Sequence, residues 1–192
     1  MLPGSSAALL ESRRPLRRRE YDHLVQLGAF DDERLELIDG VLVAMSPQGA
    51  EHADLVSTLA QILTIALGRR AKVRAHSPLA LSDESEPEPD VAVVPPGDYT
   101  RDHPKTALLV VEVADSSLRK DHVLKVPLYA AAGISEYWIV NLVDRVVEVH
   151  RAPEPMAARY ADVSTHGPHA GGEPLRLLAF PDVAVEVGDL IR

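Results

Sequence analysis

Apolar residues recur at intervals of three and four positions over residues 16–27 and 51–67, and this spacing is typical of amphipathic helices. A third helix is predicted over residues 121–132. A glycine directly follows each of the three segments, as is common after the last turn of a helix. The pattern therefore predicts three helices spread along the chain.

Shorter apolar runs bounded by turn residues predict strands. In chain order they cover residues 34–38, 41–45, 72–81, 91–94, 108–113, 136–140 and 146–150. Asp39-Gly40 between the first two runs predicts a two-residue hairpin turn. Pro78 interrupts or edges the third run. Three shorter strands are expected over residues 159–163, 175–178 and 183–187.

The segments between these elements are predicted to be connections. Residues 1–15 are expected to form a flexible lead, and residues 16–192 a single domain without internal repeats. The acidic, proline-bearing segment 83–89 is interpreted as a solvated loop, and residues 166–172 as a mobile tip.

Composition limits the chemistry that the chain can use. With 192 residues, 46% of them apolar, the chain is long enough to form a hydrophobic core. It has no cysteine, so a metal site would have to use oxygen or imidazole ligands. No apolar run is long enough to span a bilayer, and a cytoplasmic location is expected. The formal charge of −9 argues against strong nonspecific binding of nucleic acid but does not exclude a nuclease, since a bound cation changes the local field.

Two of the predicted strands each carry one carboxylate among apolar neighbours, Asp90 and Glu112. A buried strand rarely carries an unpartnered carboxylate, because desolvating a charge is costly. If these strands pair, the two carboxylates can converge on one hard cation such as Mg²⁺. Lys125 lies four positions after Asp121 on the following helix, and Tyr129 extends the same face. A lysine there could orient an attacking water or stabilise a transition state.

Each of these residues also has a purely structural interpretation. Asp90 and Glu112 would then be strand-end residues, and Asp121 and Lys125 a surface ion pair. The ordered set of acid, acid and lysine on strand, strand and helix favours the metal site over this alternative.

Several short segments together resemble a known family. They are Leu35-Glu36-Leu37-Ile38-Asp39-Gly40, Met45-Ser46-Pro47 followed by His52, Pro89-Asp90-Val91, Val110-Val111-Glu112-Val113, Asp121 with Lys125 and Tyr129, and Ala132-Gly133 leading to Glu136-Tyr137-Trp138. With this ordered set the chain resembles, from residue 21 to residue 151, the Uma family of restriction-endonuclease-like proteins in the PD-(D/E)XK nuclease superfamily.

The resemblance implies an α/β (α+β) fold, a restriction-endonuclease-like mixed β-sheet flanked by helices with additional C-terminal strands. It implies that Asp90 and Glu112 are metal ligands. The superfamily places its lysine two positions after the second acid, where this chain has Ala114. The resemblance therefore implies that Lys125, on the following helix, supplies that function.

Four further side chains are candidates around this site. Glu36 would be a third catalytic acid, although its strand could instead point it to solvent. His52 would support the ligands or cap its helix. Asp121 and Tyr129 would also support the ligands.

The pattern and the resemblance predict a magnesium-dependent endonuclease that hydrolyses nucleic-acid phosphodiester bonds, with Mn²⁺ as a substitute ion and DNA as the expected substrate. A homodimer is expected by analogy with enzymes that cut both strands of a duplex. Lys125 is expected at salt-bridge distance from Glu112, and Lys125→Met is expected to keep the fold. The alternative is a noncatalytic binding or assembly protein that retains the nuclease fold, because one fold hosts many roles.

Overall fold

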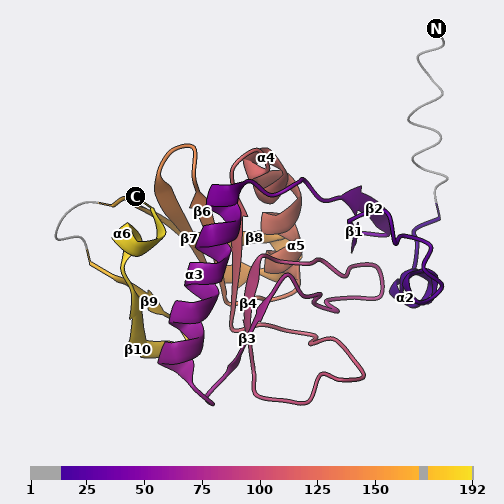
Figure 1. Cartoon of the computed structure of the whole chain (residues 1–192), viewed down its shortest axis with the longest axis horizontal. Helices are drawn as coiled ribbons and strands as arrows, with labels where there is room; N and C mark the ends of the chain where they lie inside the picture. The colour runs from indigo at the N-terminus through magenta and orange to yellow at the C-terminus, as the bar shows by residue number, and fades with distance from the viewer. Residues whose placement is uncertain (1–13, 169–172, 192) are drawn as a thin grey trace, which may run out of the picture.

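The computed structural model describes residues 14–168 and 173–191 (Figure 1). The main sheet contains β3 (Lys72–Ala75), β4 (Val91–Val94), β5 (Leu109–Ala114), β6 (Glu136–Asn141), β7 (Val146–Glu154) and β8 (Arg159–His166). Two small sheets pair β1 (Leu35–Ile38) with β2 (Val41–Ala44), and β9 (Leu175–Leu177) with β10 (Phe180–Val185). The helices are α2 (Arg18–Gln26), α3 (Ala50–Leu67), α4 (Leu118–Lys120), α5 (Val126–Ala131) and α6 (Val187–Leu190), with a π-helical turn, η1 (Asp121–Lys125), and a 3-10 turn, η2 (Pro155–Ala157).

The six strands of the main sheet lie in the order β3-β4-β5-β6-β7-β8. All neighbours are antiparallel except β5 and β6, which are parallel and are joined by the helical crossover α4–η1–α5. Every residue of β4, β5 and β6 is buried, which explains their nearly continuous apolar sequences. A mixed sheet flanked by helices confirms the predicted fold class.

Helices cover both faces of the sheet (Figure 1). On one face, α3 packs with β9, β10 and α6, and its Leu63 belongs to the same core as Trp138 of β6. On the other face, Tyr129 of α5 lies against Tyr137 of β6, with ring centroids 4.9 Å apart. The ends of β4 and β5 therefore lie where side chains from both helical layers can meet.

The hairpin predicted at Asp39-Gly40 is confirmed. Both residues have positive φ angles, 47° and 72°, as a type I′ turn requires. A Cβ atom on residue 40 would lie 2.2 Å from the Cβ of Pro15, so the turn also needs glycine for space. The N–H of Leu16 donates to the carbonyl of Gly40 at 3.0 Å, which ties the hairpin to the segment that precedes α2.

The helix predicted over residues 121–132 contains a π turn that the periodic pattern did not reveal. Pro127 has no N–H to donate to the carbonyl four residues earlier, as an α-helix would require. Instead, the N–H of Val126 donates to the carbonyl of Asp121, five residues back. The helix also begins earlier than predicted, at Leu118.

The interpretation of residues 83–89 as a solvated loop is wrong at its centre. Ser85 and Glu86 are only 1% and 3% exposed. The N–H of Glu86 donates to the carbonyl of Leu37 at 2.7 Å, and Leu37 donates back at 3.3 Å. This antiparallel bridge to β1 holds the segment inside, and composition alone cannot predict such backbone pairing.

Glu86 gives a first testable prediction. Burial raises its pKa from the ordinary 4.5 to about 7, with a further contribution from Asp22 that Arg18 opposes. The folded protein therefore binds more protons than the unfolded chain across this pH range, and its stability falls as the pH rises through it. We expect Glu86→Gln to raise the free energy of unfolding by about 1–2 kcal/mol at pH 8 and to change it little at pH 4. Denaturant unfolding at both pH values measures this, and a variant less stable than wild type at pH 8 would show that the pairing with Arg18 dominates.

The remaining sequence predictions differ in smaller ways. The strand predicted over 72–81 stops at Ala75, because His76 turns the chain with a positive φ of 44°. The three short C-terminal strands are present as β8, β9 and β10, whereas α6 was not predicted. The expected lead (1–15) lies outside the described residues except for its last two positions, and part of the expected tip (169–172) lies outside them too. None of the helices in the described ranges combines the length and the apolar character that a membrane crossing requires.

Candidate functional site

Asp90 and Glu112 lie side by side just beyond the paired residues of two antiparallel strands. Asp90 directly precedes β4, and Glu112 lies in β5, its antiparallel neighbour. The N–H of Asp90 donates to Oε2 of Glu112 at 3.3 Å, and the N–H of Val113 donates to Oδ2 of Asp90 at 2.8 Å. Each carboxylate is thus held by the backbone of the other chain segment, and both side chains are buried.

His52 reaches this pair from the first turn of α3. Its Nε2 lies 3.1 Å from Oδ2 of Asp90, whereas the N-cap of the helix is Gly49. His52 therefore supports Asp90 and does not cap the helix. Burial by itself lowers the pKa of His52, but the hydrogen bond and charge of Asp90 raise it above its ordinary value. The contact thus holds the imidazole of His52 against the carboxylate of Asp90.

Lys125 places its ammonium between two buried carboxylates. Its Nζ lies 3.2 Å from Oε1 of Glu112, as the sequence predicts, and it also contacts Oε2 of Glu36. Lys120 adds a second ammonium 3.1 Å from Oε1 of Glu36, and the N–H of Glu88 donates to Oε2 of Glu36 at 3.2 Å. Glu36 is 1% exposed, so it points into the protein and not to solvent.

These ion pairs fix the charge of Lys125. Burial alone lowers its pKa, but the charges of Glu112 and Glu36 and their hydrogen bonds raise it above the ordinary lysine value. For Glu36 the balance is the reverse: burial raises its pKa, and Lys125 and Lys120 lower it below the ordinary carboxyl value. Tyr129 completes the environment of Glu112 by donating its hydroxyl to Oε1 at 2.8 Å.

Asp121 and Lys125 do not form a surface ion pair, because each side chain is only 2% exposed. Oδ2 of Asp121 instead accepts a hydrogen bond from Oγ of Ser117 at 2.8 Å. Burial raises the pKa of Asp121 to about 6, although Ser117, Lys125 and Lys120 each act in the opposite direction. The neighbours of Asp121 thus offset only part of the cost of burying its negative charge.

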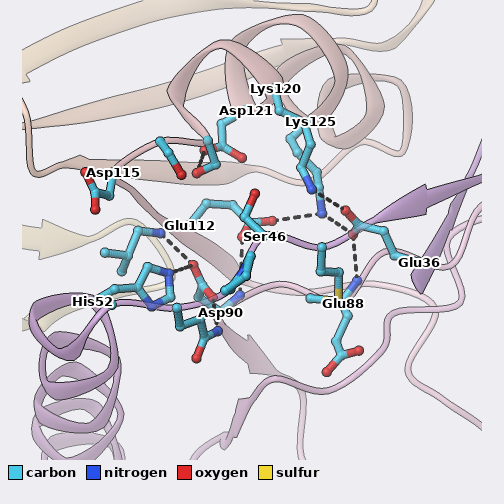
Figure 2. A pocket seen from close by; sticks show the side chains of 17 residues that line it. Glu36, Ser46, His52, Glu88, Asp90, Glu112, Asp115, Lys120, Asp121 and Lys125 are labelled. Carbon is cyan, nitrogen blue, oxygen red and sulfur yellow. Dashed lines mark hydrogen bonds and ion pairs between the residues drawn. The ribbon is translucent and has the colours of Figure 1, made fainter. Parts of the chain in front are cut away.

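A cavity of about 60 Å³ opens between these side chains (Figure 2). Asp121, Lys120 and Lys125 border it on one side and His52 and Asp90 on the other, with Glu112 between them. A water molecule needs on the order of 10–15 Å³ of such space. The cavity therefore has room for several waters beside the paired carboxylates.

The donor chemistry fits a hard divalent cation held by two protein carboxylates. Across residues 14–168 and 173–191, no group of three or more His, Asp or Glu side chains is arranged to hold a metal ion. Mg²⁺ often binds through only one or two carboxylates and keeps several waters, so Asp90 and Glu112 are a sufficient pair. Burial raises the pKa of Glu112 to about 8; Asp90, Asp121 and Glu36 add to this effect, and Lys125 opposes it. A divalent cation would offset this surplus of negative charge.

Sequence reasoning missed three side chains near these residues. Lys120 forms an ion pair with Glu36. Its position next to Asp121 in the sequence could have marked it as a candidate site residue. Gln48 and His76 approach Oδ1 of Asp90, each with a nitrogen at 3.5 Å. Nothing in the local pattern marks these two, because loops far apart in the chain bring them to Asp90.

A mixed sheet flanked by helices, with two carboxylates held together where β4 and β5 adjoin, is the arrangement of a restriction-endonuclease-like protein. The chain belongs to the Uma2 family, described as "Putative restriction endonuclease", whose family model matches residues 19–188. It is also similar to the crystal structure of a "putative nuclease belonging to DUF820" from Anabaena variabilis, with a TM-score of 0.70 and 15% sequence identity over 92% of this chain and 97% of the other. At this identity the likeness establishes the fold alone. No curated protein matches the chain in sequence.

Proposed function

We propose that this protein is a metal-dependent endonuclease that hydrolyses phosphodiester bonds of DNA, with Mg²⁺ as its ion and Mn²⁺ as a substitute. The observation that carries the proposal is the pairing of Asp90 with Glu112 at the edge of a polar cavity, beside the buried ammonium of Lys125. Membership of a restriction-endonuclease family supports a nucleic-acid substrate.

In this proposal Asp90 and Glu112 hold the ion, which when bound polarises the phosphate and lowers the pKa of a water. His52 and Tyr129 fix the orientation of the two carboxylates through their hydrogen bonds. Lys125 stays protonated, and its positive charge stabilises the negative charge that develops on the phosphate. Glu36 acts through Lys125, which it positions.

We further propose that the protein works as a homodimer in the cytoplasm. Twofold symmetry would present one site to each strand of a DNA duplex. A chain without cysteines needs no oxidising compartment in order to fold.

A metal titration tests the proposal directly. We expect wild-type protein to bind one Mn²⁺ per chain in isothermal titration calorimetry, and Asp90→Ala to bind it far more weakly, because Glu112 would be the only ligand carboxylate left in this proposal. Asp54→Ala is a matched control, since Asp54 is exposed on α3, two positions after His52, and does not line the cavity. Equal binding by wild type and Asp90→Ala would refute the assignment of Asp90 as a ligand.

The second candidate function is noncatalytic binding or assembly on the same fold. The net charge of −9 favours it, because proteins that bind nucleic acid by charge alone are usually basic. A protein that binds no Mn²⁺ and leaves supercoiled plasmid DNA intact would support this second candidate.

A further inference from the structure

We propose that Asp121 is a catalytic residue of this site, the group that accepts the proton of the attacking water. This inference rests on the proposed hydrolysis, to which it adds a base that the residue pattern does not assign.

Lys125, which the resemblance favours for activating water, is unsuited to accept a proton. Its ammonium donates to both Glu36 and Glu112 within a site that is nearly closed to solvent. Loss of its proton would leave two buried carboxylates without their shared counter-ion, which is costly. Lys125 is therefore a fixed positive charge, and the proton must go elsewhere.

Two other candidate acceptors, Glu36 and His52, are occupied or closed off. Both oxygens of Glu36 accept hydrogen bonds, from Lys120 on one side and from Lys125 and the N–H of Glu88 on the other. His52 uses Nε2 to bond Asp90, and its Nδ1 is sealed from solvent, so a water in the cavity cannot reach it.

Asp121 has the placement that a base requires. Its side chain lines the same cavity as Asp90 and Glu112, and in Figure 2 it lies across that cavity from Asp90. Ser117 holds Oδ2, and among the described residues no side chain donates to Oδ1. One oxygen is thus anchored and the other is available to a water in the cavity.

The surroundings of Asp121 also suit this role. The charged groups that face it are Lys125 and Lys120 from its own helical segment and Asp90 and Glu112 from the strands, so opposite charges partly cancel around it. Its pKa of about 6 lies close to neutral pH, where a general base is most effective. The π turn starts at Asp121 and ends at Lys125, so one short segment carries both the base and the fixed charge.

The step balances as follows. The oxygen of the water forms a bond to phosphorus, and the water proton passes to Oδ1 of Asp121. The ester P–O bond breaks, its electron pair stays on the leaving oxygen, and that oxygen takes a proton from solvent water. Asp121 then releases its proton to bulk solvent.

The test uses cleavage of supercoiled plasmid DNA by the full chain in MnCl₂. We expect Asp121→Asn to lower kcat by about a hundredfold, the scale of lost general-base assistance, while KM stays unchanged. Mn²⁺ affinity, measured separately by calorimetry, should stay within about twofold, because general-base loss does not alter the ligand carboxylates. Asp115→Asn is the matched control, since Asp115 lines the same cavity but is exposed, and it should cleave at the wild-type rate.

A second variant keeps the inference testable if Asp121→Asn does not fold. The hydrogen bond from Ser117 lowers the pKa of Asp121, so Ser117→Ala should move the acid limb of the pH–rate profile to higher pH. An unmoved acid limb, a fully active Asp121→Asn, or an Asp121→Asn that loses Mn²⁺ binding would each overturn the role of Asp121 and leave the nuclease proposal standing. A wild-type protein that cleaves no DNA would overturn both.

Discussion

Lys125→Met should lower the free energy of unfolding by about 3–5 kcal/mol, the usual cost of removing one partner from a buried ion pair. The Lys125 ammonium is shared by Glu36 and Glu112, and all three side chains are at most 8% exposed. Methionine has similar bulk but no charge, so the Glu36 carboxylate would stay buried without its closest counter-ion, and Glu112 would lose a polar partner. Denaturant unfolding in EDTA at pH 7 measures the loss.

Lys120→Met is the matched control for this prediction. Lys120 pairs with the same Glu36, but its side chain is 23% exposed, so solvent can compensate for its removal. We expect a loss of only about 1 kcal/mol from it. Adding Glu36→Gln to Lys125→Met should restore part of the lost stability, because one of the uncompensated charges disappears. A Lys125→Met protein no less stable than Lys120→Met would contradict the prediction.

Asp90→Asn should lower DNA cleavage by on the order of a thousandfold, because metal-ion stabilisation of a transition state is worth several kcal/mol and each 1.4 kcal/mol is tenfold in rate. The amide keeps an oxygen that can accept the N–H of Val113, so the end of β4 should stay in place. The amide loses the negative charge that a divalent ion requires. Plasmid cleavage in MgCl₂ measures the effect, and circular dichroism checks the fold.

Asp54→Asn, on the exposed side of α3, should cleave at the wild-type rate. An Asp90→Asn protein that cleaves within about tenfold of wild type would mean that Asp90 does not stabilise the transition state through the ion.

The fold was predictable wherever a short stretch of sequence carried the signal for its own structure. The stripe over residues 51–67 gave α3, and Asp39-Gly40 gave the hairpin, because both are local properties of the sequence. The buried segment at Ser85 and Glu86 was not predictable, since its burial depends on backbone bonds to a distant strand. The π turn was not predicted, because the spacing of apolar residues over 121–132 does not show which backbone groups bond around Pro127.

The residues of the candidate site could be predicted from the sequence, but the hydrogen bonds and ion pairs between them could not. Asp90, Glu112 and Lys125 stood out because charges in apolar surroundings require partners. The partner of each charged side chain depends on the tertiary structure. Asp121 accepts a hydrogen bond from Ser117 and does not pair with Lys125, and Glu36 points inward and pairs with Lys125. In the proposed reaction, these choices determine which group is a fixed charge and which accepts the proton.

The hairpin of β1 and β2 lies outside the six-stranded sheet, and the bridge between Leu37 and Glu86 joins it to the rest of the protein (Figure 1). We expect this hairpin to open locally at a lower free energy than global unfolding requires, because β2 is largely exposed. Because Glu36 is part of the hairpin, each opening event also withdraws the carboxylate that positions Lys125. The population of molecules with a complete charge network is therefore the population with a closed hairpin. We therefore expect amide hydrogen exchange in residues 35–44 and the fraction of molecules competent for the proposed cleavage to report the same equilibrium.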